Sequence, residues 1–228
     1  MRISFIFTEF DRRRISSEGH IKYDSPNYDN INKHFPEAEI REFTEKNVPN
    51  VFEKDPRWGY RMHDYWKVRK MLDDDADIII GFDMDMLIVN DLVKGIIPLT
   101  KKFGFCIPAS SRRLIRNDTK IGADTDKQLD DTLGTGFTMC PAVISLDRND
   151  ERARKTLEET CSLMLKDPLR LPLVLWRAIY KTGYYPYILP QNWCVTLDDL
   201  GIGDEIILHI GHKKVKDFYN ETIVKICS

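Results

Sequence analysis

No run of apolar residues in this sequence is long enough to span a lipid bilayer. The apolar stretch at residues 3–7 stops at the acidic Glu9, which is too soon for a signal peptide. The sequence also contains no internal repeats and no low-complexity tract. These absences exclude membrane-spanning and repeat architectures, and we expect a cytoplasmic protein with no membrane span.

The sequence has no closely spaced cysteine pair, and its net charge is close to zero. The five cysteines are widely spaced and form no C-x-x-C pair: Cys106, Cys140, Cys161, Cys194 and Cys227. This number and spacing predict reduced thiols in or near the core of a cytosolic protein. The formal net charge is only −2, so no overall field attracts nucleic acid or an anionic membrane. We therefore expect no nucleic-acid partner.

Apolar segments typical of strands alternate with segments of helical period. The predicted strands are residues 2–8, 39–43, 78–82, 103–107, 137–146, 184–189 and 205–210. The predicted helices are residues 24–34, 57–72 and 91–95, one that begins at Asp150, and one from Asp167 to Gly183. Such alternation predicts an α/β fold with a mostly parallel central sheet flanked by helices. We expect a single domain over residues 1–228, with a nucleotide-binding half at about 1–95 and an acceptor-side half at about 96–228.

The predicted strand 78–82 ends in two carboxylates, Asp83 and Asp85. Residues one apart in an extended segment point the same way, so both side chains can face one point. Like charges at the mouth of a core strand repel, and a bound cation relieves that repulsion. Carboxylates suit Mg²⁺ or Mn²⁺. The alternative is a strand end with two solvated aspartates.

Four segments carry a family resemblance. Residues 82–92 (FDMDMLIVNDL) resemble the D-x-D segment of the GT-A superfamily of nucleotide-sugar glycosyltransferases, in particular the glycogenin and bacterial lipooligosaccharide galactosyltransferase type. Residues 59–62 (GYRM) are similar to that type's Tyr-x-Arg-Leu element, and residues 189–193 (LPQNW) to its Leu-Pro-x-x-Trp-Asn segment. Residues 209–214 (HIGHKK) resemble a shortened His-x-x-Gly-x-x-Lys-Pro-Trp ending. The four occur in the family's order, which implies a GT-A (Rossmann-like) fold.

The resemblance also implies an activity and a site. It implies that Mn²⁺ or Mg²⁺ assists transfer of a sugar from a donor such as UDP-glucose or UDP-galactose to a hydroxyl of a glycan or glycoconjugate. The implied metal ligands are Asp83, Asp85 and His209, and His212 competes with His209 because the glycine spacing departs from the family by one residue. The implied contacts to the nucleotide sugar are Thr8, Glu9, Phe10, Arg61, Asp83, Asp85, Gly134, Gly136, Lys213 and Lys214.

The sequence features that indicate the acceptor site and its catalytic base are less specific than those of the donor site. Asp130 and Asp131 precede residues 134–136 (GTG), which resemble the small-residue entry to the sugar pocket. An inverting enzyme needs a carboxylate base for the acceptor hydroxyl, and either aspartate could serve. Retaining families often have an Asp-Gln pair where this chain has Asp167-Pro168, so both stereochemical outcomes stay open.

Two other classes share an apolar strand that ends in Asp-x-Asp. In a haloacid-dehalogenase-type phosphatase, Asp83 would be the nucleophile and Asp85 the acid/base. That motif usually lies on the first strand and is followed by Gly-Thr, whereas here two predicted strands precede it and Met86-Leu87 follows it. The other class is a non-catalytic, metal-dependent sugar-binding domain. Because 228 residues is short for a GT-A enzyme, we expect a minimal acceptor region or a place in a larger multidomain enzyme.

Overall fold

The computed structural model describes residues 1–10, 27–52, 58–110, 138–166, 171–195 and 203–211. Helices and strands alternate along most of the chain, as predicted. The helices are α1 (Tyr28–His34), α2 (Trp58–Asp73), the 3₁₀ helix η2 (Asp91–Gly95), α3 (Ile96–Phe103), α5 (Glu151–Lys166), α6 (Leu171–Thr182) and the 3₁₀ helix η3 (Gln191–Trp193). The strands are β1 (Ile3–Thr8), β2 (Glu39–Phe43), β3 (Ile78–Phe82), β4 (Met86–Ile88), β5 (Phe105–Ser110), β6 (Thr138–Met139), β7 (Val143–Asp147), β8 (Tyr187–Leu189) and β9 (Ile207–His209).

Seven strands form the central sheet, in the order β2-β1-β3-β7-β5-β6, with β8 also pairing with β5. Strands β2, β1 and β3 are parallel, and β8 is parallel to β5. Strand β7 runs antiparallel to both β3 and β5, and β6 is antiparallel to β5. Within the described part of the chain, all strands of this sheet except β6 and β7 therefore point the same way. The predicted α/β fold with a mostly parallel sheet is confirmed.

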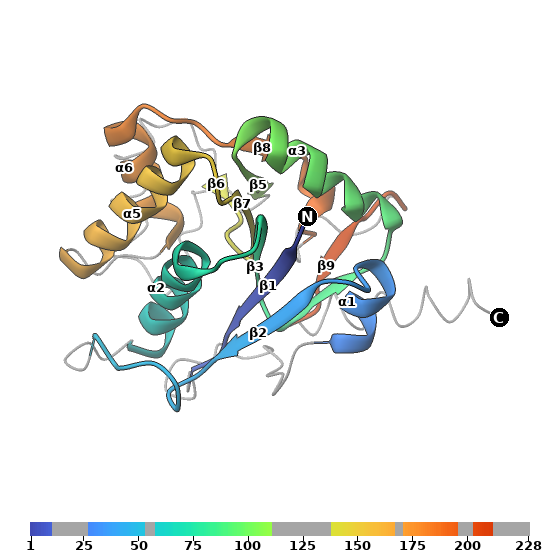
Figure 1. The fold of residues 1–228 in the computed structure, drawn as a ribbon, viewed down its shortest axis with the longest axis horizontal. Coiled ribbons are helices and arrows are strands. Elements are labelled where there is room, and N and C mark those ends of the chain that lie inside the picture. The colour runs from blue at the N-terminus through green and yellow to red at the C-terminus, as the bar shows by residue number, and fades with distance from the viewer. Residues whose placement is uncertain (11–26, 53–57, 111–137, 167–170, 196–202, 212–228) are drawn as a thin grey trace, which may run out of the picture.

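Helices cover both faces of the sheet (Figure 1). Helices α2, α5 and α6 pack on one face, against residues that include Ile6 and Ile79. Helices α1 and α3 lie over the other face, against residues that include Phe5, Ile78 and Phe82. Neighbouring residues of one strand thus enter opposite cores, because successive side chains of a strand alternate between faces. A strand buried on both faces must be apolar throughout, which explains the sequence of β3.

Some predicted boundaries differ from the structure. Helix α3 was not predicted, because Pro98 interrupts its apolar pattern; proline is tolerated in a first turn, where an N–H has no helical partner. Helix α3 also takes up the start of the strand predicted at 103–107, so β5 begins at Phe105. The strand predicted at 137–146 is divided into β6 and β7 by a turn that contains Pro141. Helix α1 begins at Tyr28 after the cap residue Asn27.

A small second sheet joins distant parts of the chain. Strands β4 and β9 are antiparallel, with Met86 opposite His209 and Ile88 opposite Ile207. Val195 forms a further bridge to Leu208. This pairing places the last described strand beside the segment that follows the two aspartates.

Gly81 lets helix α2 approach β3 closely. A Cβ atom at Gly81 would lie 2.6 Å from Sδ of Met71 and 3.1 Å from the side chain of Lys67. We expect Gly81→Ala to lower the free energy of unfolding by about 1–3 kcal/mol, the usual cost of overpacking a core. Urea denaturation measures this change. Gly95→Ala is the control, because its Cβ would meet Trp193 at an ordinary 3.7 Å; an equal loss in both variants would contradict the prediction.

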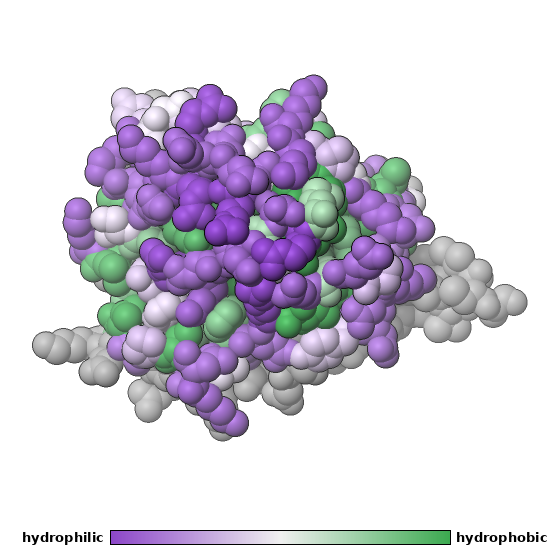
Figure 2. Space-filling view, viewed as in Figure 1, coloured by the Kyte–Doolittle hydropathy of each residue, from purple (hydrophilic) through white to green (hydrophobic). Residues whose placement is uncertain are grey.

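The surface in the orientation of Figure 1 is mainly hydrophilic. Figure 2 shows polar residues over most of this face, with small hydrophobic areas between them. This distribution is expected when the large apolar side chains are gathered in the two cores. In the part of the chain that the structure describes, no helix has both the length and the apolar character needed to cross a membrane.

Candidate functional site

Asp83 and Asp85 lie in the short turn that connects β3 to β4. The turn is tied to its surroundings through the main chain. The Asp83 N–H donates to the carbonyl of Ala142 (3.0 Å), and the Asp85 carbonyl accepts from the N–H of Ile210 (2.8 Å). The first bond ties Asp83 to the turn before β7, and the second ties Asp85 to the residue after β9. Both carboxylates are therefore held at the carboxyl end of β3, where α/β folds commonly bind ligands.

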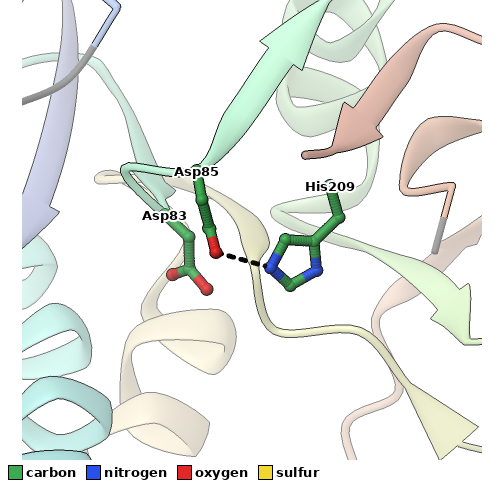
Figure 3. A group of neighbouring side chains, drawn as sticks. All are labelled: Asp83, Asp85 and His209. Carbon is green, nitrogen blue, oxygen red and sulfur yellow. Dashed lines mark hydrogen bonds and ion pairs between the residues drawn. The ribbon is translucent and has the colours of Figure 1, made fainter. Parts of the chain in front are cut away.

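His209 completes a cluster with the two aspartates. Its Nε2 lies 3.0 Å from Oδ2 of Asp85, and the side chain is 13% exposed. Figure 3 shows the Asp85 carboxylate directed at the imidazole ring, with the Asp83 carboxylate beside it. One ligand atom from each of the three residues lies within 4.8 Å of the others. The β4–β9 register creates this cluster, since it sets His209 opposite Met86, the neighbour of Asp85.

Two polar residues of α2 hold Asp83 from the other side. The Lys67 ammonium forms an ion pair with Oδ1 of Asp83 and donates to the carbonyl of Pro141 (2.9 Å). Nε2 of His63 lies 3.0 Å from the same carboxylate oxygen. The side chains of Lys67 and His63 are only 1% and 3% exposed, whereas that of Asp83 is 14% exposed. Asp83 is thus held by side chains of α2, while part of its own side chain stays exposed.

His63 connects the end of β1 to the end of β3. Its Nδ1 lies 2.8 Å from the carbonyl of Thr8 and 3.0 Å from the Thr8 hydroxyl, which donates to the main-chain carbonyl of His63. A main-chain carbonyl and an ionised carboxylate can only accept hydrogen bonds. The His63 ring therefore bridges Thr8 and Asp83, with one nitrogen facing each residue. The contact fixes the spacing between two neighbouring strand ends.

The ligand set of the cluster fits a divalent cation of the Mn²⁺ or Mg²⁺ class. Two carboxylates supply the oxygen ligands that these ions prefer, and the imidazole adds a nitrogen ligand of the kind that transition-metal ions accept. Lys67 and His63 both contact Oδ1 of Asp83, so a metal ion would share this carboxylate with them. The facing pair of Asp85 and His209 would then exchange its mutual hydrogen bond for bonds to the cation.

The pKa of His209 is raised above its ordinary value. Burial alone would lower the pKa, but the charge of Asp85 and its hydrogen bond to the ring outweigh burial. The folded protein therefore binds this proton more tightly than the unfolded chain does.

This raised pKa predicts a pH dependence of stability in the presence of a chelator. The contribution of the Asp85–His209 pair is complete below the ordinary histidine pKa of about 6.5. It is lost as the pH rises through the raised pKa of the folded state. Thermal unfolding at a series of pH values measures the effect, with His209→Gln as the control that should lack this component. A stability difference between the two proteins that does not change with pH would contradict the prediction.

Several predicted site residues lie among the described residues. Thr8 is buried at the end of β1, and the N–H of Glu9 donates to Phe43. Phe10 is 1% exposed and packs in the core beneath α2, so its ring belongs to that core. Arg61 is 2% exposed on α2. The predicted residues that lie outside the described residues are Asp130, Asp131, Gly134, Gly136, His212, Lys213 and Lys214.

Lys67 and His63 were missed by sequence reasoning. Both lie within the helix whose apolar residues were assigned to core packing. A signal was present: His63 and Lys67 are four residues apart, so they share one face of α2. Polar residues that recur on the buried face of a helix indicate specific contacts, because a buried polar group is costly unless it has a partner.

Comparison with protein-family models and with curated protein sequences finds no match. Solved structures do match. The chain is similar to mouse xyloside xylosyltransferase 1 in its apo form, with a TM-score of 0.52 and 10% identity over 92% of this chain and 97% of that one. It is also similar to a glycosyltransferase involved in the glycosylation of the major capsid of PBCV-1, with a TM-score of 0.50 and 7% identity over 95% of this chain and 99% of that one. The chain therefore has a GT-A-like glycosyltransferase fold.

Proposed function

We propose that this protein is a metal-dependent glycosyltransferase. It would transfer a sugar from a nucleotide diphosphate sugar, with a UDP-hexose as the expected donor, to a hydroxyl of a glycan or glycoconjugate. The observation that carries the proposal is the convergence of Asp83, Asp85 and His209 within 4.8 Å. It occurs in a fold similar to those of known glycosyltransferases.

The cluster suits the charge changes of sugar transfer. Breaking the bond to the diphosphate places negative charge on the leaving group, and a bound Mn²⁺ or Mg²⁺ would stabilise that charge as a Lewis acid. Asp83, Asp85 and His209 would hold the cation. Lys67 and His63 would keep the Asp83 carboxylate oriented, since both contact its Oδ1. A held carboxylate does not have to reorganise when the ligand binds.

The remaining site assignments extend the same proposal. Arg61 would contact the donor, and Lys213 or Lys214 would neutralise the β-phosphate. Asp130 or Asp131 would accept the proton of the acceptor hydroxyl in an inverting reaction. Each assignment follows from the family resemblance of its segment.

Nucleotide-sugar binding tests the proposal directly. We expect UDP-glucose or UDP-galactose to raise the thermal unfolding midpoint in the presence of Mn²⁺, and to have no effect after chelation. His209→Ala should lose the response to the Mn²⁺–nucleotide pair. Prolonged incubation with a panel of nucleotide sugars should then release free sugar slowly from the preferred donor. A shift with vanadate or beryllium fluoride, and none with any nucleotide diphosphate, would instead support the phosphatase class.

No observation among the described residues favours that phosphatase over a transferase. The two strands β1 and β2 precede the acidic turn in the chain. Measuring turnover distinguishes a transferase from a non-catalytic sugar-binding domain. Such a domain would bind the donor without releasing sugar.

A further inference from the structure

Two cysteines meet next to the acidic cluster. Cys140 lies in the turn between β6 and β7, and Cys194 directly follows η3. Their Sγ atoms are 2.9 Å apart, although the residues are 54 positions apart in sequence. Cys140 is 8% exposed and Cys194 is 0% exposed. Neither forms a disulfide in this structure.

The short separation between the sulfurs points to a bond between them. A disulfide has an S–S distance of about 2.05 Å, so a movement of less than one ångström joins the two atoms. A shared metal ion would need further ligands, as structural zinc sites have four. Among the described residues, Asp83, Asp85 and His209 are the only group of three or more such ligands, and neither cysteine belongs to it. The pair therefore has the arrangement of a dithiol.

Each cysteine belongs to a segment that holds one side of the cluster. On the Cys140 side, the carbonyl of Pro141 accepts from Lys67, and the carbonyl of Ala142 accepts from the N–H of Asp83. On the Cys194 side, the carbonyl of the next residue, Val195, accepts from the N–H of His209 (2.9 Å). A covalent bond between the two sulfurs would link the support of Asp83 to the support of His209.

We propose that Cys140 and Cys194 form an oxidative modification site, a reversible disulfide that fastens β9 and His209 to the Asp83 side of the cluster. A low-molecular-weight disulfide such as oxidised glutathione is the oxidant. The thiolate of Cys140, the more exposed residue, attacks it and releases one glutathione thiol. The thiolate of Cys194 then attacks the mixed disulfide and releases the second. Each cysteine loses a proton, their S–S bond forms, and the oxidant is reduced to two thiols.

The other two described cysteines have no such partner within bonding distance. Burial raises the pKa of the Cys106 thiol, which also contacts the Thr100 hydroxyl at 3.6 Å. Burial likewise raises the pKa of Cys161 to about 12. Because the thiolate is the reactive form, both should stay reduced under mild oxidation.

Peptide mapping of the oxidised protein tests the bond itself. A Cys227→Ser background removes the cysteine outside the described residues. After incubation with oxidised glutathione and digestion without reductant, we expect one cross-linked peptide pair that contains Cys140 and Cys194. The intact protein should have lost two hydrogen atoms, and dithiothreitol should restore them. A cross-link through Cys106 or Cys161, or stable glutathione adducts without a cross-link, would overturn the proposal.

Hydrogen exchange and thermal unfolding test the effect on the site. Oxidation should raise the unfolding midpoint by about 5–10 °C, as a disulfide that closes a long loop does in a chain of this size. It should also slow amide exchange in residues 203–211. Cys161→Ala, the matched control, should keep both responses, and Cys194→Ala should lose them. If Cys194→Ala does not fold, the unfolding midpoint and the amide exchange of the unsubstituted protein are compared with and without reductant. Unchanged exchange in 203–211 would show that the bond does not fasten β9.

Discussion

Asp85→Asn is expected to lose Mn²⁺ binding and, with it, sugar transfer. Asp85 is the residue that joins the cluster, because its Oδ2 faces His209 and its carbonyl accepts from Ile210. An amide is nearly isosteric with the carboxylate but lacks its charge. The loss of affinity should exceed about 100-fold, since even the outer partners of metal ligands are worth about 10–100-fold. Isothermal titration with Mn²⁺ measures the affinity, and donor hydrolysis measures the turnover.

A matched control separates loss of a ligand from loss of a charge. Asp91→Asn removes a carboxylate that lies on η2, is 74% exposed and pairs with His34. This variant should bind Mn²⁺ as the unsubstituted protein does. Circular dichroism should show that both variants are folded. If Asp85→Asn kept the affinity of the unsubstituted protein, the cluster would not be the metal site.

Lys67→Met is expected to destabilise the protein strongly in the absence of metal. Methionine keeps most of the side-chain volume, but it leaves the Asp83 carboxylate without its ammonium partner and the Pro141 carbonyl without its donor. Breaking a buried ion pair by removing one partner costs about 3–5 kcal/mol. Because Asp83 is 14% exposed, we expect a loss near the lower end of that range. Denaturant unfolding in the presence of a chelator measures it.

Added Mn²⁺ should recover part of this loss, because the cation then supplies positive charge beside Asp83. The increase in unfolding midpoint with Mn²⁺ should be larger in Lys67→Met than in the unsubstituted protein. Lys70→Met is the control on the same helix; Lys70 contacts the rings of Phe43 and Trp66 and no carboxylate of the site. The double variant Lys67→Met/Asp83→Asn should regain stability, since neither partner then carries a charge. A double variant no more stable than Lys67→Met would mean that the ion pair is not the cause.

The sequence was sufficient to predict the strands in the interior of the sheet. The apolar run of β3 and the abrupt acidic end after it follow from burial on both faces, which leaves polar residues for the strand end. The direction of β7 was not predictable in the same way. Its residues are equally suited to a parallel or an antiparallel strand, and the choice depends on the route of the chain over the sheet. Helix α3 was not predicted because Pro98 interrupts the helical spacing of its apolar residues.

In the candidate site, too, local sequence patterns predict some residues, whereas others depend on contacts between distant elements. Asp83 and Asp85 were predicted from local spacing alone, since the alternation of a strand sets their direction. His209 required the family resemblance, because its place depends on pairing between β4 and a strand more than a hundred residues away. Lys67 and His63 were missed because their partner, Asp83, lies on another element. Contacts between elements depend on packing, which local sequence patterns do not encode.

The β4–β9 pairing also sets the order in which this protein can mature. Asp83 and Asp85 are synthesised long before His209, which is 124 residues beyond Asp85. Contacts at such separation form late, because a long chain must first be closed into a loop. A growing chain on the ribosome can thus assemble β1, β2 and β3 while the cluster of Asp83, Asp85 and His209 is still incomplete. Mn²⁺ binding would then report the last stage of folding, when β9 closes over the acidic turn.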